Sequence, residues 1–348
     1  MKVPKIIMPS DSALHYMGRI ERKNPNAPVF YWAGSLVTFA FSGSYLSVCV
    51  DNHNNYNIAR LGYILDGAES QLVLSSCADF PQECMIPVSG EGLHTFTLFK
   101  RQDDPHYFTL RGISIAQDAE IRALPDKSTL KLEFFGDSVT AGSVCEAIDH
   151  VGQIDPPVYD SSYDNAWHSY AMQTARLLNA QVHLTAQGGI ALLDNSGYFD
   201  NGRFGMESTY DKLCYVSYAA QRTAWDFTQY QPDFVILAIG QNDRHFDGID
   251  CDCFPHARRE RWLKTYREMV SDLLGKYPQA QFLLTLTILQ HDPYWETLLD
   301  DACDLIADPR VMRFRFSRTG QATPGHPRIP EHTEMAEELA AFILTKLG

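Results

Sequence analysis

The chain has 348 residues and a formal net charge of −14 at pH 7. Hydrophobic residues make up 45% of it and charged residues 21%, which is typical of a soluble globular protein with one large core or two. The net negative charge argues against a nucleic acid or an anionic membrane surface as a partner. No apolar run is long enough to span a bilayer, since the best runs, such as residues 234–239, have the length of a buried strand.

The N-terminus begins with charged residues but lacks the apolar stretch and the small-residue cleavage site of a secretion signal, so a cytoplasmic location is expected. The eight cysteines are scattered along the chain, which is typical of reduced thiols rather than of a disulfide framework. Cys251, Cys253 and His256 lie close together in the sequence, but their spacing matches no zinc template well. We therefore predict neither a metal nor another cofactor.

Short alternating runs characterise the first part of the chain, to about residue 125. Apolar residues recur at every second position within each run, and Gly or Asp residues separate the runs. This pattern predicts an antiparallel β-sandwich. The expected strands are residues 36–41, 45–50, 61–65, 71–74, 94–99 and 108–115.

From Thr129 onward the pattern changes to alternating strands and helices. Five buried strands with crossover helices predict a doubly wound parallel sheet that is covered on both faces. Residues 122–128 form the natural boundary, so we predict one domain of residues 1–125 and another of residues 126–348. The expected strands are residues 130–135, 181–185, 234–239, 282–286 and 311–316, and the expected helices are residues 167–178, 259–274, 295–307 and 331–347.

A serine follows the first of these strands, in the run Gly136-Asp137-Ser138. The strand brings the hydroxyl of Ser138 to the carboxyl edge of the sheet, and a helix is expected to begin just after it. A nucleophile that must receive a substrate and stabilise an oxyanion needs this arrangement. A turn with serine at a helix N-cap has the same sequence, so the residues downstream decide between the two interpretations.

Two further strand ends supply polar groups, because the carboxyl ends of parallel strands share one crevice. Gly188 and Gly189 follow the second strand, where glycines either let backbone N–H groups approach a ligand closely or form a tight turn and nothing more. Asn242 follows the third strand, and its amide can donate to a developing oxyanion. Asp243 is expected to brace this loop.

A histidine near the C-terminus, His326, follows the last strand and is predicted to reach the same crevice. Its imidazole can take a proton from a serine near neutral pH and return it to a leaving group. His332 is the alternative, but we expect it in the first turn of the last helix, facing solvent or capping that helix. His326 is therefore the better candidate for the general base.

Together these residues resemble the four sequence blocks of the SGNH/GDSL hydrolase superfamily. The resemblance covers the chain from about residue 130 to the end, and each block follows a predicted strand. It implies a flavodoxin-like α/β/α domain with a five-stranded parallel sheet. The blocks are Gly136-Asp137-Ser138, a glycine of the pair Gly188-Gly189, Gly240-x-Asn242-Asp243, and His326-Pro327.

A narrower resemblance covers the whole chain. Residues 31–35 and 92–95 of the expected sandwich are similar to carbohydrate esterase family 2. So are residues 225–227 and 231–233, which lead to the third block. That family joins a small jelly-roll-like domain to an SGNH catalytic domain and removes acetyl groups from plant polysaccharides. The resemblance therefore implies an acetylesterase of the acetyl xylan esterase type.

Carried over residue by residue, the resemblance makes Ser138 the nucleophile and His326 the general base, which later acts as the acid. The oxyanion hole would use the backbone N–H of Ser138, the Asn242 side chain and one further backbone N–H. Either Gly188 or Gly189 would supply that last group.

One position departs from the superfamily pattern. The superfamily often has an Asp three residues before the His, where this chain has Thr323. That acid normally fixes the imidazole tautomer and stabilises the imidazolium. Some family 2 enzymes work with a Ser–His dyad, so we predict a dyad in which the carbonyl of Thr323, or a nearby loop carbonyl, orients His326. The family's aromatic residue just before the His is also replaced, by Gly325.

The expected substrate is an acetylated sugar or oligosaccharide of the xylo-, gluco- or manno- type. Imported oligosaccharides suit a chain without a secretion signal better than intact polymer does. The alternatives are an SGNH esterase or thioesterase for another short acyl ester, and a carbohydrate-binding protein that has lost catalysis. Loop 146–165 is a candidate rim of the site, and aromatic residues after the second block either wall a carbohydrate cleft or pack beneath the loop. These aromatic residues are Tyr198, Phe199, Phe204, Tyr210, Tyr215, Tyr218 and Trp225.

Overall fold

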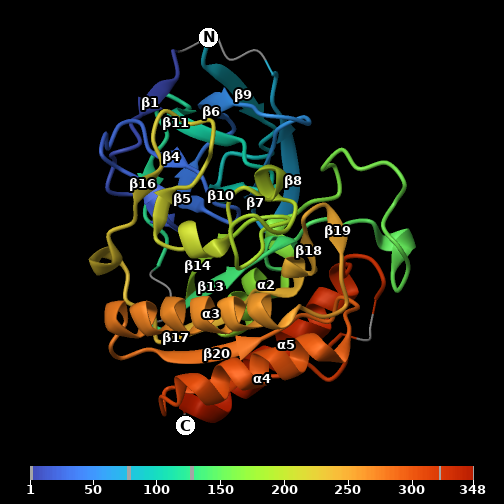
Figure 1. Ribbon diagram of the computed structural model, residues 1–348. Coiled ribbons are helices and arrows are strands. Elements are labelled where there is room, and N and C mark those ends of the chain that lie inside the picture. Colours follow the sequence, from blue (N-terminus) through green and yellow to red (C-terminus); the bar gives the residue numbers. More distant parts are fainter. Residues whose placement is uncertain (1–2, 77–79, 126–128, 321–322, 348) are drawn as a thin grey trace.

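Two antiparallel β-sheets packed face to face form the first part of the protein in the computed structural model (Figure 1). The structure describes residues 3–76, 80–125, 129–320 and 323–347. One sheet has the strand order β3-β4-β11-β6-β9, with β1 beside β11, and the other has the order β12-β5-β10-β7-β8, with β2 beside β5. The strands are β1 (Lys5–Ile7), β2 (His15–Met17), β3 (Ile20–Glu21), β4 (Val29–Phe30), β5 (Leu36–Ser42), β6 (Leu46–His53), β7 (Arg60–Leu65), β8 (Ala68–Val73), β9 (Gln82–Ile86), β10 (Leu93–Lys100), β11 (Tyr107–Ile115) and β12 (Ile121–Arg122).

The alternating sequence pattern explains this sandwich. Phe39 of β5, Phe96 of β10 and Phe108 of β11 are buried within one apolar core, which the two sheets enclose. The residues next to each of these along its strand point to the opposite face of the sheet, away from this core, as a period of two residues requires. The predicted sandwich is confirmed. Strand β9 and the short strands at the edges were not among the expected strands.

A five-stranded parallel sheet forms the centre of the second part. Its strand order is β14-β13-β17-β20-β21, which is the 2-1-3-4-5 order of flavodoxin-like folds. The predicted parallel sheet is therefore confirmed. The edge strand β21 ends three residues earlier than expected, and Phe314 still donates one backbone hydrogen bond to Leu284. The strands are β13 (Lys131–Gly136), β14 (Gln181–Ala186), β17 (Phe234–Ala238), β20 (Gln281–Thr285) and β21 (Val311–Arg313).

Four helices cover the two faces of this sheet. Helices α2 (Tyr170–Leu177) and α5 (Ile329–Leu347) pack on one face with Phe134 and Ile236, whereas α3 (His256–Lys276) and α4 (Pro293–Ile306) lie on the other (Figure 1). Buried side chains on both faces explain why the strands are continuously apolar. Within the described residues, no helix combines the length and the hydropathy that a membrane span requires. The shorter elements are α1 (Ser138–Ala141), 3-10 turns at Ile148–His150, Ala166–His168, Phe199–Gly202, Met206–Ser208, Phe227–Gln229 and Gln241–Arg244, and strands β15 (Lys212–Cys214), β16 (Thr223–Ala224), β18 (His245–Phe246) and β19 (Ile249–Asp250).

A buried ion pair joins the sandwich to the parallel sheet. Arg19, which directly precedes β3, places its guanidinium 2.8 Å from the carboxylate of Glu133 on β13, and both side chains are fully buried. Thr185 and Tyr277 also donate hydrogen bonds to this carboxylate. Such satisfied charges are costly to separate, so the pair ties the sandwich, called the accessory domain below, to strand β13 of the parallel sheet. The expected domain boundary stays a prediction, and residues 126–128 of it lie outside the described part of the chain.

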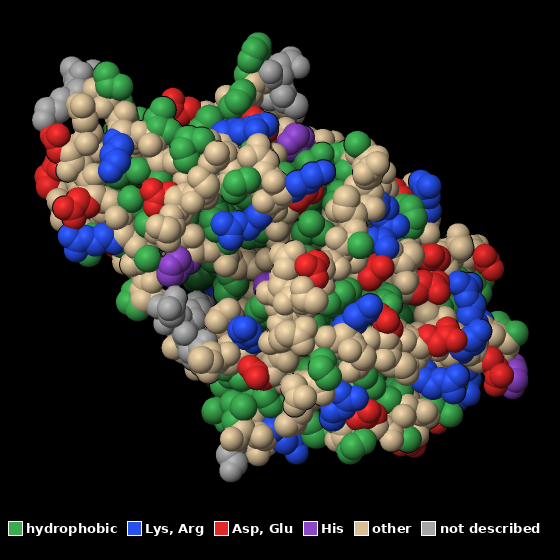
Figure 2. All heavy atoms as spheres, turned by 90° about the vertical axis from the view of Figure 1, so that its left-hand side faces the viewer, with side chains coloured by type: hydrophobic (Ala, Val, Ile, Leu, Met, Phe, Trp, Pro, Cys, Tyr) green, Lys and Arg blue, Asp and Glu red, His purple; other side chains and the backbone are tan. Residues whose placement is uncertain are grey.

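Acidic and basic side chains alternate over the face of the molecule shown in Figure 2, and neither sign forms a continuous band there.

The seven cysteines that the structure describes are free thiols, of which Cys145 and Cys214 are buried. The eighth, Cys77, lies outside the described residues.

Candidate active site

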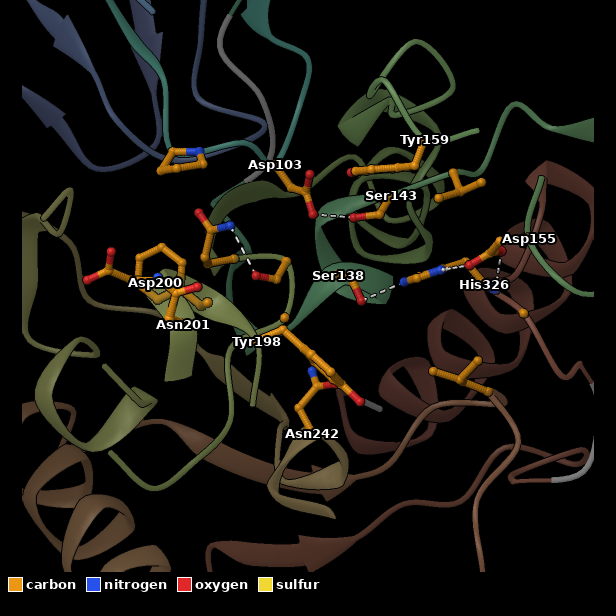
Figure 3. A pocket seen from close by; sticks show the side chains of 18 of the residues that line it. Asp103, Ser138, Ser143, Asp155, Tyr159, Tyr198, Asp200, Asn201, Asn242 and His326 are labelled. Atoms are coloured by element: carbon orange, nitrogen blue, oxygen red, sulfur yellow. Dashed lines mark hydrogen bonds and ion pairs between the residues drawn. The ribbon is translucent and has the colours of Figure 1, made fainter. Parts of the chain in front are cut away.

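A pocket of about 740 Å³ opens at the carboxyl edge of the parallel sheet. This edge, where the strand order reverses around β13 and β17, is where open α/β folds bind ligands. Figure 3 shows the side chains that point into the pocket, from segments far apart in the sequence. The sequence-predicted residues that line it are Ser138, Gly188, Gly189, Asn242 and His326.

Ser138 stands at the first position of the short helix α1, as the strand-to-helix pattern predicts. The preceding Asp137 caps this helix, because its carboxylate accepts a hydrogen bond from the backbone N–H of Val139. Gly136 permits the sharp turn, since a Cβ there would lie 2.1 Å from the hydroxyl of Thr140. The Ser138 hydroxyl is thereby held at the pocket floor with 8% of the residue exposed.

His326 lies between two oxygen atoms. Its Nε2 is 2.8 Å from the Oγ of Ser138, and its Nδ1 is 2.7 Å from a carboxylate oxygen of Asp155. The expected Ser–His dyad is therefore wrong as a description of this geometry, because an acid from loop 146–165 contacts the imidazole. The carbonyl of Thr323, which we expected to orient the ring, instead accepts the backbone N–H of Gln290 at 2.8 Å.

Asp155 is itself fixed by several donors. Its Oδ1 accepts the backbone N–H of His326 at 2.9 Å and the guanidinium of the fully buried Arg328 at 2.8 Å. Although burial favours the neutral acid, hydrogen bonds and positive charge from His326 and Arg328 hold the pKa of Asp155 well below its usual range. Asp155 is therefore ionised at neutral pH, and its carboxylate is available to orient the imidazole.

The glycine before the histidine has a spatial reason. A Cβ at Gly325 would lie 2.7 Å from the backbone nitrogen of Asp155 and equally close to its Oδ1. Loop 146–165 thus occupies the space that an aromatic side chain at position 325 would need. The two departures from the family pattern, Thr323 and Gly325, are compensated by one loop.

His332 does not face solvent, contrary to the expectation from the sequence. It is fully buried, and its Nδ1 accepts the backbone N–H of Tyr170 at 3.0 Å. Burial lowers the pKa of His332 to about 3, so it stays neutral. The residue lies in the first turn of α5 as expected, but the packing of α5 against α2 turns it inward as a structural acceptor.

Donors for an oxyanion surround the serine. Among the described residues, no protein group accepts the backbone N–H of Gly188 or of Gly189. The Asn242 amide nitrogen donates to the carbonyl of Ile190 at 3.1 Å, and its other contact, to Asp137, is long at 3.4 Å. Because this contact is weak, the amide hydrogen that makes it is available to donate to an oxyanion, which is a stronger acceptor.

Asp243 braces the neighbouring loops, as expected. Its buried carboxylate accepts the backbone N–H groups of Leu192 and Leu193 at 2.6 and 2.9 Å. Burial raises the pKa of Asp243 to about 7, against the effect of these hydrogen bonds. The loop after β14 is thus attached to the loop after β17, so the candidate oxyanion donors keep their relative positions.

The aromatic residues divide between pocket and core. Tyr198 and Phe199 line the pocket, whereas Tyr215 is buried and stacks on Trp32 with 3.9 Å between ring centroids. Loop 146–165 does form a rim, through Asp155 and Tyr159 (Figure 3). Besides Asp155, the sequence analysis missed other residues that line the pocket. Among them are Arg244 after β17 and a wall from the accessory domain, made by Asn55, Tyr56, Asp103 and Pro105.

A group that offers metal ligands lies elsewhere. Among the described residues, Glu69, Glu146 and His168 place ligand atoms within 4.8 Å of one another, whereas Cys251, Cys253 and His256 form no such group. The carboxylate of Glu69 is 2.6 Å from the His168 ring, and the Asn165 amide donates to both glutamates. Protein groups therefore already satisfy these side chains, as in an ordinary polar cluster.

Two family models match the chain in succession. Residues 16–125 match the model of the carbohydrate esterase 2 N-terminal domain. Residues 134–341 match the model of the GDSL-like lipase/acylhydrolase family, which is more than half of the chain. The chain belongs to the GDSL-like lipase/acylhydrolase family. The order of the two matches is that of the two-domain carbohydrate esterases of family 2, which confirms the resemblance seen in the sequence.

Two known proteins are similar to nearly the whole of this GDSL-like chain, at low sequence identity. It is 28% identical to the cellulase/esterase CelE of Acetivibrio thermocellus, covering 96% of this chain but only 39% of CelE. It is also 28% identical to an acetylxylan esterase/glucomannan deacetylase of Cellvibrio japonicus, covering 96% of this chain and 88% of that protein. The chain thus spans less than half of the first of these relatives.

Solved structures support the two-domain fold. A family two carbohydrate esterase from Cellvibrio japonicus superimposes with a TM-score of 0.81 at 24% identity, covering 99% of this chain and 98% of the other. A family two carbohydrate esterase from Clostridium thermocellum, solved in complex with cellohexaose, gives a TM-score of 0.77 at 26% identity and covers 96% and 99%. The sandwich and the parallel sheet therefore adopt the same mutual arrangement in these structures.

Proposed function

We propose that this protein is a carboxylic ester hydrolase that removes O-acetyl groups from acetylated carbohydrates. The observation that carries this proposal is the hydrogen-bonded chain from Ser138 through His326 to Asp155 at the floor of an open pocket. A hydroxyl, an imidazole and a carboxylate in this order are the parts of an acyl-transfer site. The GDSL-like family match and the esterase relatives support the same reaction class.

In the proposed reaction the Oγ of Ser138 attacks the ester carbonyl while the Nε2 of His326 takes its proton. Asp155 accepts a hydrogen bond from the Nδ1–H of His326, which keeps the reactive tautomer in place and stabilises the imidazolium that forms. His326 then returns the proton to the sugar oxygen as it leaves, and an acetyl-enzyme remains. A water molecule, deprotonated by the same imidazole, releases acetate and restores Ser138.

The negative charge of each tetrahedral intermediate needs fixed donors. We assign this role to the backbone N–H of Ser138, to the Asn242 amide and to an N–H of Gly188 or Gly189. Removal of one such donor typically lowers kcat by about 10²- to 10³-fold. Asn242→Ala is expected to fall within this range.

The carbohydrate part of the proposal rests on the relatives and on the pocket. One relative is named an acetylxylan esterase/glucomannan deacetylase, and another was solved with cellohexaose. In this chain Tyr198, Phe199 and Tyr159 line the pocket with the serine. Their ring faces are suited to the apolar faces of sugar rings.

Acetate release from a panel of acetylated xylo-, gluco- and manno-oligosaccharides tests the proposal. The wild-type protein should release acetate from at least one of them, and Ser138→Ala should release none above background. Butyrate and longer esters serve as the comparison, since equally fast cleavage of those esters would make the protein a general short-chain esterase. Sugar binding without cleavage of any ester would instead support the carbohydrate-binding alternative.

A cytoplasmic location is also part of the proposal, and it makes short oligosaccharides the natural substrates. Fractionation of cells that express the native gene tests it. Activity recovered outside the cytoplasm would overturn this part without affecting the esterase assignment.

A further inference from the structure

The accessory domain supplies one wall of the pocket, although the catalytic groups belong to the other domain. Asn55, Tyr56, Asp103 and Pro105 line the cavity together with Ser138. Asp103 and Pro105 lie on the connection between β10 and β11, which reaches from the sandwich to the edge of the parallel sheet. Figure 3 shows the Asp103 carboxylate on the same side of the pocket as Ser143 and above Ser138.

Two contacts fix Asp103 next to the reacting groups. Its Oδ2 accepts a hydrogen bond from the hydroxyl of Ser143, whose backbone N–H bonds the carbonyl of Ser138 at 2.9 Å. The same oxygen lies against Gly188, where a Cβ would be 2.0 Å from it. The carboxylate is thus packed between the turn that carries the nucleophile and the glycine pair assigned to the oxyanion hole.

The second oxygen of Asp103 has no donor within the protein. Although the residue as a whole is only 3% exposed, it lines the pocket, and among the described residues no side chain or backbone group donates to its Oδ1. The two buried cations of the same segment bond elsewhere: Lys100 donates to the carbonyls of Gln102 and Asp104, and Arg101 donates to Asp164 and Glu146. A group that donates to this oxygen from the pocket would therefore form a charge-assisted hydrogen bond without displacing a protein donor.

An oxyanion cannot be that partner, because two negative charges would repel each other. A hydroxyl group can, since it donates to a carboxylate in a charge-assisted hydrogen bond. Asp103 adjoins both the nucleophile turn and Gly188. A hydroxyl that reaches it from a bound ester must therefore lie within a few bonds of the acyl oxygen.

We propose that Asp103 accepts a hydrogen bond from a free hydroxyl on the carbon next to the acetylated position, so that the accessory domain determines which sugar esters are cleaved. This inference rests on the proposed function, because it concerns the substrate of the same site. Sugars carry such neighbouring hydroxyls as a rule, whereas simple alkyl acetates do not. Selectivity for partly acetylated rings over fully acetylated ones follows.

The test is a cycle that removes the hydroxyl from the substrate and the carboxylate from the enzyme. The substrates are a methyl xyloside monoacetate with a free neighbouring hydroxyl, its deoxy analogue and its methyl ether at that carbon. Wild type should prefer the hydroxyl substrate over both analogues by about 10- to 100-fold in kcat/KM, since a methyl ether can accept but not donate. In Asp103→Ala this preference should fall below about threefold, and in Asp103→Asn it should be intermediate.

Asp104→Asn is the matched control, because Asp104 is the adjacent buried aspartate but does not line the pocket. It should keep the wild-type preference. The proposal is overturned if wild type cleaves the deoxy or ether substrate as fast as the hydroxyl substrate, or if Asp103→Ala keeps the full preference. If Asp103→Ala does not fold, the preference of Asp103→Asn and the wild-type rate with the methyl ether substrate still test the proposal.

Failure of the proposed function gives a different result. Wild type would then cleave p-nitrophenyl acetate but release acetate from none of the sugar esters. In that case 2-hydroxyethyl acetate and 2-methoxyethyl acetate replace the sugar pair. A wild-type preference for the hydroxyl ester that Asp103→Ala loses supports the role of Asp103, and equal rates overturn it.

Discussion

The carboxylate of Asp155 contacts His326 twice, through the imidazole Nδ1 at 2.7 Å and through the backbone N–H at 2.9 Å. The two residues are 171 positions apart in the sequence. One carboxylate thus fixes both the rotation of the ring and the backbone that carries it. Arg328, which donates to Asp155 and to the carbonyl of His326, closes this arrangement on the buried side.

Asp155→Asn should lower kcat by about 10²- to 10⁴-fold with little change in KM, because the amide does not stabilise the imidazolium and can favour the wrong tautomer. Initial rates with p-nitrophenyl acetate measure this. Asp149→Asn, an exposed residue of the same loop, is the control and should retain wild-type rates. If Asp155→Asn loses less than threefold, His326 works as a dyad partner despite the geometry.

The same carboxylate predicts a pH dependence of stability. Because the folded state depresses the pKa of Asp155, the wild type gains stability that is fully present above the unfolded-state value of about 4 and is lost progressively below it. The difference in free energy of unfolding between wild type and Asp155→Asn should therefore be nearly constant from about pH 6 to pH 5 and shrink between about pH 5 and pH 3, which urea titrations can measure. A difference that stays constant down to pH 3 would contradict the assignment.

Thr323→Ala should affect stability more than catalysis. The Thr323 hydroxyl is buried and donates to the carbonyl of Gly325 at 3.1 Å, so its removal should cost about 1 kcal/mol of the free energy of unfolding. Because neither its hydroxyl nor its carbonyl contacts the imidazole, kcat should stay within about threefold of wild type. A tenfold loss of kcat in a fully folded variant would show that the side chain positions His326 after all.

Arg19→Met should destabilise the protein by about 3–5 kcal/mol, because it leaves the charge of Glu133 buried without its ion-pair partner. Urea unfolding measures the change. The exposed pair of Arg122 and Glu120 provides the control, and Arg122→Met should change stability by no more than about 0.5 kcal/mol. The double variant Arg19→Met/Glu133→Gln should recover part of the loss. If Arg19→Met and Arg122→Met changed the free energy of unfolding equally, the buried pair would not be what joins the domains.

The sequence was sufficient for the parts of the site that follow regular elements. Ser138, Gly188 and Asn242 each come just after a strand of the parallel sheet, and His326 lies in the loop between the last strand, β21, and α5, so the order of strands brings them to one edge. Asp155 could not be found this way, because loop 146–165 has mostly irregular structure and no periodicity fixes its course. The prolines at positions 156 and 157, directly after Asp155, were a sign of a rigid segment but not of its direction.

The other misses have the same origin. Asp103 belongs to the sandwich, and no pattern within one domain indicates which of its connections will face the other domain. His332 was expected outside because its place in a first helical turn was known, whereas the packing of α5 on α2 was not. Both errors concern contacts between elements, which depend on tertiary packing rather than on local propensity.

The wall that the accessory domain contributes means that the boundary of folding and the boundary of function differ in this chain. Residues 134–341 match a family model on their own, yet a catalytic domain separated from its partner would have an open side where Tyr56 and Asp103 now stand. Loss or exchange of the sandwich would therefore change the shape that a substrate meets, and not only the affinity for a distant polymer. Evolution of substrate preference in such chains can proceed through residues that lie outside the hydrolase fold altogether.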